Sequence, residues 1–211
     1  MIKTVFYPIT IALLQFLLSS EQLSGQGDHS WKLVKEEGKT KVYTRAKEDV
    51  KIKEVKITTT IKASMDRFLS VLDDVPDYIN WVFRCKSAKR LLTISENEFY
   101  YYTSTKLPFP LSDRDIVIHT RQWKDPLTKT VYSESVADPD YIPEKENHVR
   151  IPFLKTSWEI RPESDGTLKI SYLICTDPGG SLPAWLVNLA ITQGPIKTMD
   201  GLARLVEDSK Y

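Results

Sequence analysis

The chain has 211 residues, of which 41% are hydrophobic and 27% are charged, as is typical of a globular protein. Its net charge at pH 7 is only +1, so no strong field favours nucleic acid or an anionic membrane as a partner. The three histidines, His29, His119 and His148, are too isolated in the sequence to suggest a metal site. We therefore expect no nucleic-acid partner, no metal and no cofactor.

Residues 1–25 have the pattern of a secretory signal peptide. Lys3 supplies a short positive segment, residues 5–18 are mostly apolar, and small residues including Ser24 and Gly25 follow. The alternative to a cleaved signal peptide is an uncleaved membrane anchor. The apolar run, however, is shorter than the about 20 residues that a spanning helix needs. We expect cleavage near Ser24 or Gly25 and export to the periplasm or the extracellular space.

The first part of the mature chain predicts strands and one short helix. Trp31–Glu36 and Lys41–Arg45 predict two strands around a turn at Gly38, and Lys51–Ile61 alternates charged and apolar residues like a half-buried strand. Ser64 then caps a short helix that places apolar residues on one side, namely Phe68, Leu69 and Leu72.

The middle of the chain is predicted to be almost all strand. Turn signals separate seven segments, which are Cys85–Thr93, Glu98–Ser104, Asp115–Trp123, Thr130–Val136, His148–Ile151, Thr156–Arg161 and Leu168–Thr176. Successive meanders of this kind favour an antiparallel sheet. Cys85 and Cys175 lie on two of these strands, either as small buried residues or as a disulfide in an oxidising compartment.

The segment Asp177–Leu186 marks the change from sheet to helix. Pro178-Gly179-Gly180 predicts a sharp reversal of the chain, with glycines that would allow a lid to move. A long helical pattern then runs almost to the C-terminus and is interrupted at Gly194-Pro195. A curved antiparallel sheet wrapped around one long C-terminal helix predicts an α+β helix-grip fold in a single domain over residues 31–209. That geometry favours binding over catalysis.

Four groups of residues, in this order, resemble motifs of one known family. They are Tyr78-Ile79-Asn80-Trp81, the proline-rich turn Pro108–Asp115, Val149-Arg150 with Trp158–Pro162, and Asp177–Gly180 with Leu182–Asn188. On these residues the chain resembles START domains, the lipid-transfer family related to the steroidogenic acute regulatory protein, over roughly Trp31 to Glu207. The resemblance implies an internal cavity that holds one lipid or a similar apolar molecule.

Strand alternation and helical spacing, together with the resemblance, predict the lining of this cavity. The expected inward-facing residues are Phe99, Tyr101, Thr103, Ile116, Ile118, Thr120, Ile170, Tyr172, Ile174, Leu189, Ile196 and Met199. For any one of these residues, packing in a solid core without ligand contact is an equally good interpretation.

Two positions depart from the family pattern. Sterol-binding members pair an acidic with a basic side chain inside the cavity, and the corresponding residues here are Tyr101 and Thr120. A phenol and a hydroxyl can orient a hydroxylated or ester-bearing ligand without the burial of a charge. Arg150 is expected to contact a lipid headgroup or, alternatively, to form a salt bridge with a carboxylate such as Asp115.

Catalytic motifs are missing from the sequence. It contains no G-x-S-x-G, H-E-x-x-H, P-loop or G-x-G-x-x-G pattern, so we expect a carrier and not an enzyme. An enzyme of the cyclase or hydrolase type on the same fold is the first alternative, and a ligand-free periplasmic interaction module is the second. The expected partners are a lipid or other hydrophobic molecule and, transiently, a membrane, with the protein as a monomer.

Overall fold

The computed structural model describes residues 30–47 and 50–207, and the predicted signal peptide lies outside the described residues. In chain order the elements are β1 (Lys32–Glu37), β2 (Thr40–Lys47), β3 (Val50–Lys62), α1 (Met65–Leu72), η1 (Val75–Asp77), α2 (Tyr78–Trp81), β4 (Cys85–Ser95), β5 (Glu98–Thr105), β6 (Asp113–Lys124), β7 (Val131–Ala137), β8 (His148–Arg150), β9 (Phe153–Pro162), β10 (Thr167–Asp177), α3 (Ala184–Thr192) and α4 (Gly194–Glu207). None of the helices in these described ranges is long and apolar enough to cross a membrane.

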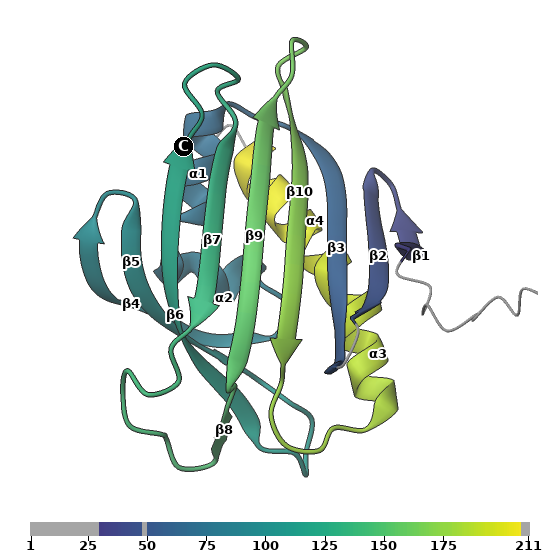
Figure 1. Cartoon of the computed structure of the whole chain (residues 1–211), viewed down its shortest axis with the longest axis vertical. Helices are drawn as coiled ribbons and strands as arrows, with labels where there is room; N and C mark the ends of the chain where they lie inside the picture. Colours follow the sequence, from purple (N-terminus) through teal and green to yellow (C-terminus); the bar gives the residue numbers. More distant parts are fainter. Residues whose placement is uncertain (1–29, 48–49, 208–211) are drawn as a thin grey trace, which may run out of the picture.

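The strands form one curved sheet, which is seen from its outer side in Figure 1. Its order is β1-β2-β3-β10-β9-β7-β6-β5-β4, with antiparallel pairing throughout, and β8 pairs in parallel with the first residues of β6. The last strand, β10, lies between β3 and β9 and therefore joins the N-terminal strands to the later meander. Alternation along β3 gives the sheet two faces. Lys56, Thr58 and Thr60 are partly exposed, whereas the residues that alternate with them are buried, namely Val55, Ile57, Thr59 and Ile61.

The helices cover the inner face of this sheet, with α4 crossing behind β3 and β10 in Figure 1. The core between the layers contains fully buried side chains from both, including Ile57, Phe68, Ile160 and Leu202. Helix α4 also approaches α2 very closely at Gly201, where an added Cβ atom would lie 2.8 Å from the backbone oxygen of Trp81.

These observations confirm the predicted α+β helix-grip fold and refine its details. The predicted C-terminal helix is interrupted where expected, so that α3 and α4 are separate helices on either side of Gln193. Strand β9 begins at Phe153 and not at Thr156, and β6 begins at Asp113 and not at Asp115. Cys85 and Cys175 are not joined by a disulfide, which leaves the interpretation of two small residues on separate strands.

Candidate ligand-binding cavity

A cavity lies between the sheet and the helices, at the end where β5 and β10 finish and where β6 and β9 begin. It has two adjoining chambers. The sheet chamber, of about 320 Å³, is bounded mainly by strand residues such as Tyr101, Ile116 and Trp158. The lid chamber, of about 310 Å³, lies under α3, the start of α4 and the turn at Pro178. Each volume falls at the lower end of the range that is usual for small-molecule sites.

The two chambers share part of their walls. The side chains that border both are Val82, Thr105, Ile151, Tyr172, Ile174 and Thr198. Most of the remaining lining is apolar, with Phe83, Leu107 and Leu186 in the lid chamber and Leu72 and Leu154 in the sheet chamber. The arrangement can therefore remove an extended apolar molecule from water, at a gain of about 25 cal/mol for each Å² buried.

The structure brings eight of the predicted residues to this cavity. The sheet chamber is lined by Tyr101, Thr103, Ile116 and Ile118, the lid chamber by Leu189 and Met199, and both by Tyr172 and Ile174. Their positions follow from the alternation of side chains along β5, β6 and β10 and from the spacing of α3 and α4.

Four other predicted residues face inward but do not border either chamber. Phe99, Ile170 and Ile196 are buried in the solid part of the core, and Thr120 is buried with its hydroxyl 2.8 Å from that of Ser135. Phe99 and Thr120 are opposite each other on β5 and β6, and the Thr120 hydroxyl contacts two side chains that line the sheet chamber, Tyr101 and Ser135. These residues are buried behind the chamber wall and do not border the open space.

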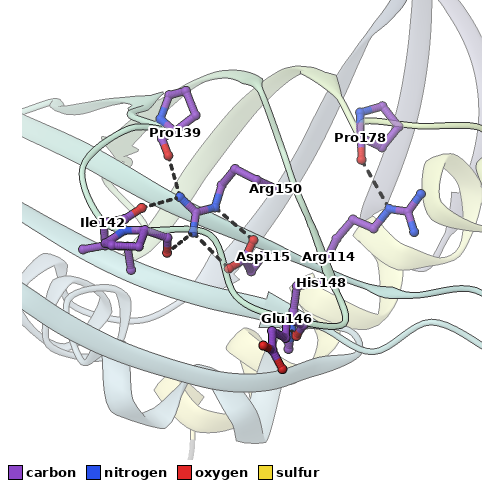
Figure 2. Close-up of polar contacts among 9 residues, drawn as sticks. Arg114, Asp115, Pro139, Ile142, Glu146, His148, Arg150 and Pro178 are labelled. Atoms are coloured by element: carbon purple, nitrogen blue, oxygen red, sulfur yellow. Dashed lines mark hydrogen bonds and ion pairs between the residues drawn. The ribbon is translucent and has the colours of Figure 1, made fainter.

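Arg150 is also away from both chambers, because it forms the predicted alternative, a salt bridge with Asp115. Figure 2 shows the guanidinium group directed at this carboxylate, with Nε and Nη2 at 2.9 and 3.2 Å from the two oxygens. The same group donates to the backbone oxygens of Pro139, Ile142 and Pro143 in the loop after β7. Both side chains are almost fully buried, and the pair fastens this loop to β6.

Arg114 directly precedes Asp115 on β6, so its side chain lies on the opposite side of the strand, where it borders the lid chamber. Its guanidinium donates to the backbone oxygens of Ser112, Pro178 and Gly179, and the contact with Pro178 is visible in Figure 2. Burial lowers the pKa of this group from its usual value. Arg114 therefore holds the turn before α3 against the start of β6.

The polar side chains of the sheet chamber are phenols and hydroxyls. Burial is the main cause that raises the pKa of Tyr101 above its ordinary value, partly offset by a hydrogen bond with Thr120. Burial likewise raises the pKa of Tyr172 to about 12, partly offset by a hydrogen bond with Thr156. Both phenols therefore stay neutral and can donate or accept hydrogen bonds inside the cavity.

Several lining residues were absent from the sequence prediction. Thr156 and Trp158 are two residues apart on β9 and so share a face of the sheet; the alternation that predicted Tyr172 could also have predicted them. The rings of Trp158 and Tyr172 stack with their centroids 3.9 Å apart. Tyr78 and Trp81 come from α2, whose four residues are too few for a helical period to show which side faces inward. In the described parts of the chain, no group of three potential metal ligands is present.

Comparison with known proteins agrees with this geometry. The START domain family model matches residues 17–210. An uncharacterized protein of Pseudomonas aeruginosa is 34% identical over 177 residues, which cover 84% of this chain and 87% of the relative. Phosphatidylcholine transfer protein of Rattus norvegicus is 27% identical over 173 residues, or 78% of each chain.

Solved structures show the same fold. The STAR-related lipid transfer protein of Xanthomonas axonopodis superposes with a TM-score of 0.77 at 30% identity, over 84% of this chain and 99% of that one. An aromatase/cyclase from Streptomyces sp. R1128 has a TM-score of 0.51 at 10% identity over 74% of this chain and 94% of that one, which indicates a shared fold alone. The match to the family model and the likeness to the Xanthomonas protein show that this chain belongs to the START domain family.

Proposed function

We propose that this protein binds one lipid, or a similar hydrophobic molecule, in its two-chambered cavity and carries it across an aqueous compartment. The observation that carries this proposal is the pair of adjoining, mostly apolar chambers between the sheet and the C-terminal helices. The relatives support the same function, because two of them are named as a phosphatidylcholine transfer protein and a STAR-related lipid transfer protein.

The proposed route includes export and contact with a membrane. The signal-peptide pattern of residues 1–25 supports release into the periplasm or the extracellular space. Large aromatic side chains are exposed beside lining residues: Phe109 is 96% exposed and Trp185 is 56% exposed. Aromatic rings of this kind favour the interface between lipid and water, so we propose that this end of the molecule meets the membrane during loading.

We further propose that the protein acts as a monomeric carrier and not as an enzyme. The named functions of the phosphatidylcholine and STAR-related relatives support a carrier, whereas the likeness to the cyclase is one of fold. The cavity supports it as well, because the phenols that border it stay neutral and its other lining is mainly apolar.

Native mass spectrometry of residues 26–211, followed by organic extraction, tests the proposed function. We expect a stoichiometric adduct of lipid size after expression or after incubation with total lipid extract. A second measurement follows the movement of fluorescent lipid from donor to acceptor vesicles. A protein that stays empty with every lipid and does not accelerate transfer would refute the proposal.

A further inference from the structure

The two chambers of the cavity differ in charge. Among the described residues that border the lid chamber, the charged side chains are Arg84 and Arg114, and none is an aspartate or a glutamate. The described residues that border the sheet chamber include no charged side chain of either sign. The cavity therefore has one positive half, under α3 and the turn at Pro178, and one uncharged half between the strands.

Arg114 is a buried cation whose partners are all uncharged. Its residue is only 5% exposed, and its guanidinium donates to three backbone oxygens. Figure 2 shows the contrast with Arg150, which is equally buried but is directed at the Asp115 carboxylate. Backbone oxygens satisfy the N–H donors of Arg114 but do not neutralise its charge. Buried charges in proteins are normally paired with an opposite charge, so this wall lacks an anion.

The acidic residues next to this wall in the sequence are engaged elsewhere. Asp113, directly before Arg114 on β6, forms a salt bridge with Lys86 at 2.6 Å. Asp177, at the end of β10, accepts a hydrogen bond from the backbone N–H of Gly179 at 2.9 Å. Burial lowers the pKa of Arg114, which is the direction expected for a buried cation without an anion beside it.

Arg84 presents a second, accessible guanidinium to the lid chamber. It is exposed and lies between α2 and β4 with a φ of 59°, a conformation that is uncommon for a residue with a side chain and that occurs preferentially at functional sites. In residues 30–47 and 50–207 its guanidinium makes one hydrogen bond, to the backbone oxygen of Lys106 at 3.5 Å. Most of its N–H donors are therefore available to a ligand.

We propose that the lid chamber holds the negatively charged head group of a lipid, such as a phosphate, with Arg84 as its hydrogen-bonding partner and Arg114 as a buried compensating charge. A guanidinium binds an oxyanion through two parallel hydrogen bonds, which are stronger than those between neutral groups. The hydrocarbon part of the lipid then lies in the uncharged sheet chamber. The inference rests on the proposed function and makes it more specific, because it assigns the charge of the lipid and its orientation in the cavity.

The experiment measures the affinity of residues 26–211 for dioleoylphosphatidate and dioleoylglycerol, which differ only in the phosphate, each delivered from cyclodextrin. We expect phosphatidate to bind at least about 10-fold more tightly. Dioleoylphosphatidylcholine adds a trimethylammonium group that would lie close to the two arginines, so it should bind more weakly than phosphatidate. Arg84→Gln should lower the ratio of phosphatidate affinity to dioleoylglycerol affinity by about 3- to 10-fold.

Lys129→Gln is the matched control. Lys129 is also an exposed cation with a φ of 59°, but it lies in the turn between β6 and β7 and borders neither chamber. The affinity ratio should therefore be unchanged in this variant. Inorganic phosphate in excess, at matched ionic strength, separates a lipid head group from a free anion. It should not displace phosphatidate, because it has no hydrocarbon to bury in the sheet chamber.

An unchanged affinity ratio in a folded Arg84→Gln protein, or dioleoylglycerol that binds as tightly as phosphatidate, would overturn the inference and leave the proposed carrier function in place. Displacement by inorganic phosphate would overturn it as well, by assigning the site to a free anion. If Arg84→Gln unfolds, Arg84→Asn takes its place, because asparagine tolerates a positive φ. A wild-type protein that binds none of the lipids, and is empty in the mass spectrum, would refute the proposed function itself.

Discussion

Replacement of Arg150 by methionine tests whether this residue stabilises the fold or contacts a ligand. The change leaves the Asp115 carboxylate buried, at 1% exposure, without the guanidinium that pairs with both of its oxygens. Loss of one partner from such a pair costs about 3–5 kcal/mol. For a domain of this size, 1 kcal/mol lowers Tm by about 2–4 °C, so we expect Tm to fall by about 6–20 °C.

Thermal unfolding followed by circular dichroism measures this shift, and native mass spectrometry measures the lipid content of the protein that remains folded. The double variant Arg150→Met with Asp115→Leu removes both charges and should recover a large part of the lost stability. Lipid content below the unfolding temperature should stay at the wild-type level. An unchanged Tm together with a loss of bound lipid would refute the reasoning and assign Arg150 to a headgroup.

Three other substitutions test the cavity, the helix packing and an acidic contact. Ile118→Arg places a charge in the sheet chamber and should reduce lipid content in the mass spectrum at least 10-fold, whereas Leu127→Arg, at a position 89% exposed, should not. Gly201→Ala presses a Cβ atom against the backbone of Trp81 and should lower the free energy of unfolding by about 1–3 kcal/mol in urea titration. Hydrogen bonds from a lysine and a backbone N–H lower the pKa of Asp113 from 3.8 in the folded protein. The charged carboxylate therefore stabilises the fold above pH 3.8, and this stabilisation is lost as the pH falls through the lower folded-state pKa. The stability difference between wild type and Asp113→Asn should therefore shrink in urea titrations below pH 4; a constant difference from pH 7 to pH 3 would contradict this origin.

The strands and their inward faces could be predicted because alternation is a local property of the sequence. Tyr172 and Ile174 line the cavity as the alternation on β10 indicates, and Ile170 faces the same side. The alternation does not predict the path of α4 across that face. Ile170 and Ile196 are both buried in the core, yet neither borders a chamber, so the periodicity indicates the buried side of each element but not the part of it that stays open.

The contribution of α2 was beyond the sequence prediction for a different reason. A four-residue helix has no repeat from which a buried side could be inferred, and Trp81 packs closely against Gly201 in α4. That contact joins residues that are far apart in the chain. The resemblance to START domains placed Tyr78–Trp81 in the connection before β4, but gave no direction for these side chains.

Consecutive residues on β6 fasten two loops on opposite faces of the sheet, because side chains alternate along a strand. Asp115 holds Arg150 and the loop after β7 on the outer face, whereas Arg114 holds the turn at Pro178 and Gly179 over the lid chamber. Within the described part of the chain, the Arg114 guanidinium donates to three backbone oxygens and to no carboxylate, so its bonds can break without leaving a buried carboxylate unpaired. If this turn must move for a lipid to enter, Arg114→Lys, which loses the planar fork of donors, should accelerate lipid exchange between protein and vesicles several-fold. Because no carboxylate is left unpaired, the same variant should lose less Tm than Arg150→Met. Exchange at the wild-type rate in a folded Arg114→Lys protein would show that the lipid enters by a path that leaves this turn closed.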